Sequence, residues 1–365
     1  MKINVITRHS IVNYGSYFQT IATQNFFEEN GYECNIIDYI SKDETILGNI
    51  KVNSRKRKGI KKILYPLLKF PDEFLKTKKF YKFTRKNMNL TKRFSSHKDL
   101  KGYTFSDLLC SGSDQLWGYM PNGKIDDAYL LNFKKEQNKC ISFASSFGRA
   151  DFKEEEWNHI GNELKKYSVI SLREAALVNK INHDYSLKSF PILDPTLMVK
   201  PEFWFGQCSK VKRVIKNKYI LVYQLRSNSN MDNYIELVSH KLNLKVIRIS
   251  TQVYDIFKKN TLVLKKPEIV LSIFKDADLV ITDSFHATIL SIIFNKQFID
   301  VLPPNTSLRI VDLLNTLNLN GQIIKSYDDL DMLNNKIEYE LVNDKLEKLR
   351  IKYKNEYLKQ LEDLQ

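Results

Sequence analysis

The chain has 365 residues, 43% of them apolar, which is enough to form two hydrophobic cores of ordinary domain size. Its net charge of +15 is unevenly distributed: residues 51–101 contain 18 Lys and Arg and three acids, whereas the remaining chain has 39 of each sign. Because no nucleic-acid motif accompanies this basic segment, we expect no nucleic-acid partner.

The cysteines and the apolar runs indicate the compartment. Four cysteines lack the close spacing of redox and metal motifs, and most lie in or beside apolar runs, which is typical of reduced core thiols. No apolar run approaches the roughly 20 residues of a spanning helix, and the first strand is too short for a signal peptide. We therefore expect a cytoplasmic protein, soluble or peripheral to the membrane. The histidine spacing predicts no metal, and without a dinucleotide or P-loop motif we expect no cofactor.

In the first half of the chain, short apolar runs alternate with helical patterns. Strands are predicted near 2–7, 33–39, 106–110, 139–145 and 168–172, and helices near 16–29, 153–166 and 173–181. This alternation is typical of a parallel sheet covered by helices. It predicts a Rossmann-like domain over residues 1–182, with a basic insertion at 51–101.

The insertion mixes lysines with aliphatic and aromatic residues, most clearly over Gly59–Phe70. A basic amphipathic segment of this kind can lie on an anionic membrane surface. It can equally be a solvated helical insertion whose apolar side packs on the first domain. Both interpretations remain open from the sequence.

In residues 183–217, Pro191, Pro195 and Pro201 precede a lysine-rich run. We therefore predict a linker between two domains there. A second alternation of strands and helices then predicts a C-terminal Rossmann-like domain over 218–330. Residues 331–365 are predicted to form a charged helix.

One predicted strand-to-helix junction stands out, because the apolar strand ending near Thr282 runs into Asp283, Ser284 and His286 before a helical pattern starts. The first amide groups of a helix have no partner within it and attract anions. Asp283 or Ser284 can cap this start, with His286 in the first turn. The alternative is a packed histidine bonded to backbone, but the polar neighbours favour a pocket.

Four other polar motifs follow predicted strands: Asn13-Tyr14-Gly15 with Gln19, Ser111–Trp117, Ser145–Gly148 and Ser171–Glu174. Together with Thr282–Thr288, these five blocks, in this order, resemble the polysaccharide pyruvyl transferase family. The resemblance extends from about residue 5 to about residue 320. It implies an α/β fold with two Rossmann-like doubly wound domains facing a cleft, similar to the GT-B arrangement of many glycosyltransferases. The C-terminal domain would then lie on the donor side.

The resemblance also implies the chemistry, which is transfer of a pyruvyl group from phosphoenolpyruvate to two hydroxyls of one sugar, giving a cyclic ketal and phosphate. A small, highly charged donor requires anion-binding groups, and arginine's planar fork suits carboxylate and phosphate. The expected donor-binding residues are Arg173, Arg309, Ser284 and Arg149. For Arg173 the alternative is a surface salt bridge with Glu174 or another neighbour.

Ketal formation requires a proton on the methylene carbon of the donor, and His286 is the expected general acid. Because a helix start favours neutral imidazole, His286 can instead bind phosphate as a neutral donor. Asp114 and Gln115 are expected either to orient the acceptor sugar or to cap the turn after their strand. Asn13, Tyr14 and Gly15 are expected to bind the acceptor or to support its loop.

The sequence thus predicts a cytoplasmic pyruvyl transferase of surface-polysaccharide assembly, with a glycan acceptor that can be linked to polyprenyl diphosphate. In the membrane interpretation of the basic segment 51–101, this segment holds the enzyme against an anionic membrane surface. One rival is a nucleotide-sugar-dependent glycosyltransferase with the same fold. Another, from a different class, is a non-catalytic, membrane-associated assembly protein that retains only the fold.

Overall fold

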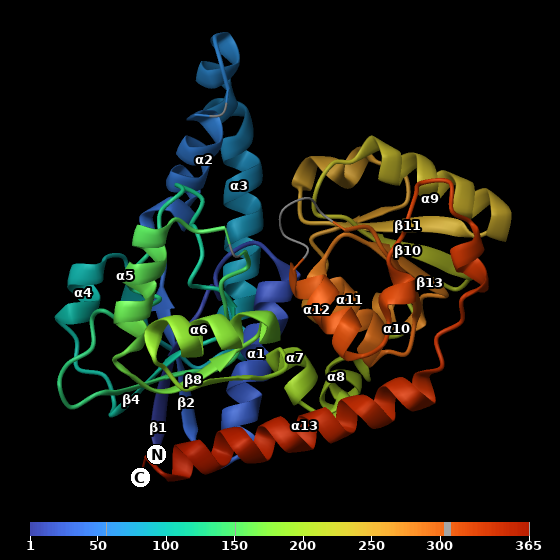
Figure 1. Ribbon diagram of the computed structural model, residues 1–365. Helices are drawn as coiled ribbons and strands as arrows, with labels where there is room; N and C mark the ends of the chain where they lie inside the picture. Colours follow the sequence, from blue (N-terminus) through green and yellow to red (C-terminus); the bar gives the residue numbers. More distant parts are fainter. Residues whose placement is uncertain (56, 150, 303–307, 365) are drawn as a thin grey trace. The chain divides into compact units, whose positions relative to one another are not determined.

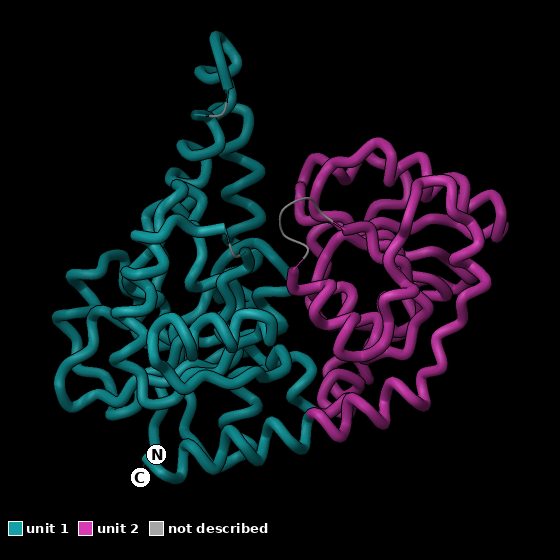
Figure 2. The backbone as a smooth tube through the Cα atoms, in the orientation of Figure 1, with its two compact units in different colours: residues 1–199, 350–365 teal, residues 200–349 magenta. Residues whose placement is uncertain are grey.

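The computed structural model describes residues 1–55, 57–149, 151–302 and 308–364. The chain forms two compact units: unit 1 comprises Met1–Val199 and Arg350–Gln365, and unit 2 comprises Lys200–Leu349 (Figure 2). Each unit has its own parallel sheet, which confirms the predicted α/β class with two doubly wound domains.

In the described residues of unit 1 the sheet has nine strands, in the order β3-β2-β1-β4-β6-β8-β7-β5, with β9 paired to β8. The strands are β1 (Lys2–Ile6), β2 (Glu33–Tyr39), β3 (Leu90–Phe94), β4 (Leu108–Ser111), β5 (Asp114–Gln115), β6 (Lys139–Ser142), β7 (Ser145–Ser146), β8 (Tyr167–Leu172) and β9 (Ser189–Pro191). Ile3 of β1 lies opposite Cys34 on one side and Leu108 on the other. All three side chains are buried, as expected for a parallel sheet covered on both faces.

The helices of unit 1 are α1 (Tyr14–Glu29), α2 (Ile46–Arg55), α3 (Ile60–Asn87), α4 (His97–Lys101), α5 (Glu154–Leu164), α6 (Val178–Tyr185), α7 (Pro195–Met198) and the end of α13 (Tyr339–Glu362), with 3₁₀ turns at Lys42–Glu44 and Ala175–Leu177. Phe26 and Phe27 of α1 pack against Phe143, with ring centroids 4.5 and 5.1 Å away. Tyr357 of α13 is fully buried in this same aromatic cluster. The charged C-terminal helix therefore ends in the core of unit 1.

The basic segment 51–101 is not a single insertion. Its last part contributes β3, which pairs with β2 at the sheet edge, and the short helix α4. Only α2 and α3 stand out, as a helical pair that projects from the rest of unit 1 (Figure 1). Phe94 explains why β3 belongs to the sheet, because its side chain is buried against Tyr103 and Phe105.

Unit 2 has five strands in its described residues, in the order β12-β11-β10-β13-β14. They are β10 (Tyr219–Tyr223), β11 (Lys245–Ser250), β12 (Thr261–Val263), β13 (Leu279–Thr282) and β14 (Gln297–Asp300). The helices are α8 (Pro201–Cys208), α9 (Ser229–Leu242), α10 (Pro267–Asp276), α11 (Phe285–Ile293), α12 (Leu308–Thr316) and the start of α13, with 3₁₀ turns at Val253–Phe257, Asn320–Gln322 and Asp331–Asn334. The parallel register places Thr282 of β13 opposite Asp300 of β14 and also opposite Tyr223 of β10, so these three strand ends lie together.

The region 183–217, which the prolines suggested to be a linker, contains β9, α7 and α8, and the division between the units falls at Val199. Pro195 and Pro201 occupy the first positions of α7 and α8. Proline suits that position because its missing N–H would have no helical partner and its φ is already helical. The prolines therefore mark helix starts rather than an extended connection.

Candidate functional site

In unit 2, polar groups gather where β13 ends and α11 begins. The Thr282 hydroxyl donates to the carbonyl of Tyr223 at 2.6 Å and accepts from the Ser284 amide at 3.0 Å. These hydrogen bonds stabilise the turn between β13 and α11, and they give the buried Thr282 hydroxyl both a donor and an acceptor partner. The start of α11 is consequently held in one place at the carboxyl ends of the strands, which is where open α/β sheets bind ligands.

Asp283 does not cap α11 but organises the neighbouring loop. Its two carboxylate oxygens accept the amides of Leu225 and Arg226, at 2.7 and 3.1 Å, in the segment that follows β10. Burial raises the pKa of Asp283, and the two backbone N–H bonds act in the opposite direction. Asp283 thus holds the segment that follows β10, which contains Arg226, next to the start of α11.

Ser284 occupies the N-cap position of α11 with extended backbone, and its side chain makes no capping bond. The hydroxyl and the first-turn amides of α11 therefore form a donor-rich edge at the positive end of the helix dipole. Such an edge suits a phosphate or carboxylate.

His286 is the second residue of α11, with 8% of the residue exposed. Its ring lies edge-on to Phe285, with centroids 5.3 Å apart. The guanidinium of Arg309, from α12, stacks on the same Phe285 ring at 5.1 Å from its centroid. The structure therefore brings the two predicted residues His286 and Arg309 to the same aromatic side chain. Residues 303–307, which precede Arg309, lie outside the described residues.

A buried carboxyl that the sequence analysis did not select lies at the end of the next strand. Asp300 is fully buried at the carboxyl end of β14, and its Oδ1 accepts the Thr288 hydroxyl of α11 at 2.7 Å. Burial raises the pKa of Asp300 to about 8, although the Thr288 bond lowers it. An acidic residue closing an apolar strand, Gln297–Asp300, was the available signal.

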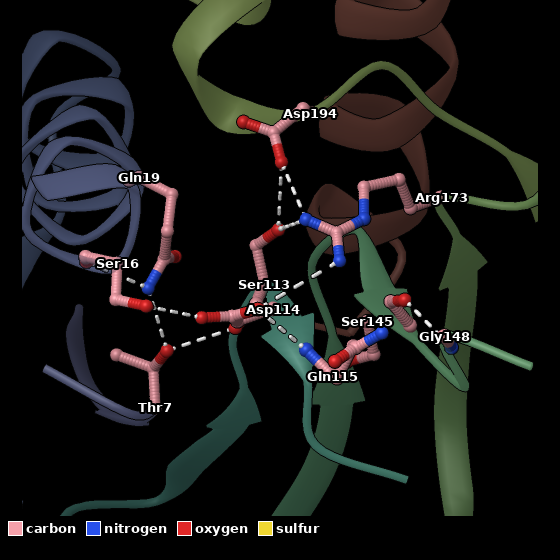
Figure 3. A network of polar contacts seen from close by, with 12 residues as sticks. Thr7, Ser16, Gln19, Ser113, Asp114, Gln115, Ser145, Gly148, Arg173 and Asp194 are labelled. Carbon is pink, nitrogen blue, oxygen red and sulfur yellow. Dashed lines mark hydrogen bonds and ion pairs between the residues drawn. The ribbon is translucent and has the colours of Figure 1, made fainter. Parts of the chain in front are cut away.

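In unit 1, a second polar network surrounds Asp114 (Figure 3). Asp114 has φ +84°, a left-handed conformation that is uncommon outside glycine. Its carboxylate accepts the Ser16 hydroxyl at 2.6 Å and the Gln115 amide at 2.8 Å. Asp114 therefore links the start of α1 to the turn after β4, and its unusual backbone is typical of sites where function constrains geometry.

Arg173, at the end of β8, is buried beside this network. Its Nη1 donates to Asp194 at 2.7 Å and to the Ser113 hydroxyl at 3.4 Å, and its Nη2 lies 4.0 Å from Asp114 Oδ1. The predicted alternative partner Glu174 instead accepts from Ser146 and from the amides of Phe147 and Gly148. Arg173 is thus held between two carboxylates, and Asp194 is a network member that sequence spacing did not reveal.

The motif Asn13-Tyr14-Gly15 forms the start of α1. Asn13 is its N-cap and accepts the Gly15 amide at 2.8 Å, while Tyr14 is 1% exposed and packs on Phe80. Gln19, one turn later, donates to the Thr7 hydroxyl at 2.9 Å. These contacts hold the start of α1 against the end of β1 and against α3.

Two further predicted residues lie around the Ser145–Gly148 loop. Arg149 is ion-paired with Asp151 and stacks on Tyr119, 5.1 Å from the ring centroid. The Gln115 side chain packs directly on the backbone of Gly148, where an added Cβ would lie 2.0 Å from Gln115 Nε2.

Gly148→Ala is therefore expected to lower the free energy of unfolding by about 1–3 kcal/mol, because φ is +72° there and the methyl group would displace Gln115. Chemical denaturation of the variant measures this change. Gly206→Ala, in α8 with open space around it, is the matched control and should not destabilise the protein. Equal denaturation midpoints for Gly148→Ala and wild type would contradict the prediction.

Within the residues that the structure describes, we find neither a metal-binding cluster nor a membrane-spanning helix. No group of three or more His, Cys, Asp or Glu side chains there is arranged to hold a metal ion. Within the same residues, no helix combines the length and apolar character needed to cross a bilayer.

Comparison with known proteins agrees with this architecture. No curated protein matches the sequence. Among solved structures, UDP-GlcNAc 2-epimerase from Methanocaldococcus jannaschii is similar at 14% identity and TM-score 0.51, covering 95% of this chain and 93% of its own. The corresponding epimerase from Neisseria meningitidis is similar at 11% identity and TM-score 0.52, covering 97% and 94%. At such identities the likeness shows a GT-B-like fold alone.

A comparison of the sequence with models of protein families identifies the family. Residues 13–305 match the profile of the family described as polysaccharide pyruvyl transferase. This match contains the Asp114 network, Arg173 and the His286 junction described above. The chain therefore belongs to the polysaccharide pyruvyl transferase family.

Proposed function

We propose that this protein forms a pyruvate ketal on a sugar of a bacterial surface polysaccharide, or of its polyprenyl-diphosphate-linked precursor, using phosphoenolpyruvate on the cytoplasmic side of the membrane. The observation that carries the proposal is the start of α11, where His286 and Arg309 share the Phe285 ring at the positive end of a helix. Family membership supports the transferase class.

The reaction requires a proton on the methylene carbon of the donor, after which the adjacent carbon accepts one sugar hydroxyl. Departure of phosphate and attack by the second hydroxyl of the same sugar then close the ketal. Phosphate carries charge throughout, so cationic and N–H donors held in place before the reaction stabilise its transition states. The Ser284 hydroxyl, the first-turn amides of α11 and Arg309 supply such donors in unit 2.

His286 has two candidate roles, as the acid that protonates the methylene carbon or as a hydrogen-bond donor to phosphate. In unit 1, Asp114 and Gln115 are candidates for orienting the acceptor. Arg173 is the candidate anion ligand of that unit, and Arg149 is a further candidate, although both are already ion-paired.

The direct test combines purified protein, phosphoenolpyruvate and lipid-linked or free glycans, with release of inorganic phosphate and the mass gain of one ketal as readouts. Release that depends on the glycan supports the proposal. A protein stabilised in thermal melts by nucleotide sugars, and inactive with phosphoenolpyruvate, would instead be the glycosyltransferase of the first rival interpretation. Inactivity with every donor would favour the non-catalytic assembly protein.

Arg173→Lys is expected to weaken phosphoenolpyruvate binding by about tenfold or more, although it preserves the charge, because an ammonium group cannot bind an anion in the two-pronged manner of guanidinium. Calorimetric titration of the donor measures this. A purely structural Arg173 would give a lower melting temperature with unchanged affinity in the folded variant. Arg93→Lys, at an exposed arginine of β3 that is ion-paired with Asp38 and is not a candidate ligand, is the matched control.

A further inference from the structure

The outer face of α3 is unusually apolar for a surface. Eight side chains between Ile60 and Leu75 are 42 to 75% exposed. They are Ile60, Ile63, Leu64, Leu67, Leu68, Phe70, Phe74 and Leu75. Steps of three and four residues place them along one side of the helix, and we call this set the outer face of α3. Contiguous exposed apolar patches mark interaction sites in otherwise soluble domains.

In the middle of α3 the opposite side is polar and buried, the reverse of an ordinary amphipathic helix, before Phe80 continues the buried side. Asp72, Glu73 and Lys76 are each less than 8% exposed. Lys76 Nζ lies 2.6 Å from Glu73, which also accepts a hydrogen bond from Asn49 of α2 at 2.9 Å. Charges are buried only when they are paired, so this polar interface fixes which side of α3 meets α2. Because the polar side of α3 packs against α2, the apolar side faces outward.

The charge around the outer face has one sign. Continuing along the same side of α3, the exposed residues are Lys78, Lys82, Arg85 and Lys86. The two acids of α3 are the buried Asp72 and Glu73, so its exposed residues include no negative charge. An apolar stretch followed by basic residues matches an interfacial helix, with apolar side chains among acyl chains and ammonium groups at the phosphates.

We propose that the outer face of α3 and the basic residues after it bind an anionic lipid surface. The α2–α3 pair projects from the rest of unit 1 (Figures 1 and 2). A second copy of the chain is a poorer occupant, because it would bring the same cationic face to the contact. The inference rests on unit 1 surface chemistry and holds whether or not the proposed transfer reaction is correct.

Co-sedimentation of the full chain with vesicles tests the proposal. Wild type is expected to sediment with phosphatidylglycerol-containing vesicles at low salt, much less at high salt, and little with pure phosphatidylcholine. Replacing Lys78, Lys82, Arg85 and Lys86 by Gln should weaken the binding by roughly ten- to a hundredfold, since each basic residue contributes about fivefold before screening. The control replaces four exposed lysines of unit 2 instead: Lys210, Lys212, Lys216 and Lys218. It removes the same charge and should keep near wild-type binding.

A second pair of variants tests the apolar part. Leu67→Gln with Leu68→Gln is expected to reduce sedimentation at least tenfold, because both side chains are more than 70% exposed and would lose their acyl contacts. Leu341→Gln with Ile351→Gln, on exposed positions of α13, is the control and should bind normally. Melting temperatures equal to wild type show that each variant is folded.

Two results would overturn the proposal. The first is a failure of the vesicle test: either the wild-type protein does not sediment with anionic vesicles at low salt, or the variants of the outer face sediment as well as wild type does. The second is that wild type does not bind vesicles but dimerises in a concentration-dependent way in ultracentrifugation, and that Leu67→Gln with Leu68→Gln abolishes this dimer. These readouts need no turnover, so an inactive protein that binds vesicles would contradict the transferase proposal and leave this one standing.

Discussion

His286→Ala is expected to reduce pyruvyl transfer by roughly 10²- to 10⁴-fold, the range for loss of a general acid or of a preorganised electrostatic donor. The fold should survive, because α11 is held by the other buried residues of Phe285–Ile293 and alanine is a strong helix former. Steady-state phosphate release measures the loss, and His183→Ala, with a 91% exposed side chain, is the matched control. Turnover near wild type in His286→Ala would remove His286 from the mechanism.

A second substitution at His286 separates its two candidate roles. His286→Gln keeps a neutral N–H donor near the start of α11 but cannot transfer a proton. Substantial recovery of activity relative to His286→Ala would identify a hydrogen-bond donor to phosphate. Activity as low as that of His286→Ala, with donor affinity retained in calorimetry, would identify the proton donor.

The sheet architecture and its polar junctions were predictable because they depend on local patterns. Apolar runs and turn chemistry located β1, α1, β2 and β13, and also the start of α11 directly after β13. The prolines at 195 and 201 were misleading, because proline at a first helical position and proline in a linker look alike in sequence.

Long-range partners were not predictable. Asp194 meets Arg173 across 21 positions, and Asp283 accepts amides more than 50 positions away, so no spacing rule connects them. The same limit applies to α3, where periodicity indicated an amphipathic helix but not which side would be buried. That choice is decided by charge pairs such as Lys76 with Glu73 and by contacts from α2.

Asp300→Asn is expected to remove a large pH dependence of stability. In the unfolded chain this carboxyl ionises near pH 4, whereas burial raises its pKa to about 8 in the folded protein. Between those values the folded state holds the extra proton, so the free energy of unfolding falls as pH rises, by at most about 1.4 kcal/mol per pH unit. The full cost, of order 5 kcal/mol as an upper limit, is present above about pH 8.

Asparagine is uncharged at every pH and can still accept the Thr288 hydroxyl with its carbonyl oxygen. The variant should therefore be close to wild type in stability near about pH 5 and clearly more stable near about pH 8. Urea unfolding midpoints across this range measure the difference, and Asp331→Asn, an exposed carboxyl of unit 2, is the control and should show no such divergence. Midpoints of wild type and Asp300→Asn that run parallel with pH would show that Asp300 is ionised in the folded protein. Divergence would establish a protonated carboxyl in contact with the helix that carries His286, because Thr288 joins Asp300 to α11.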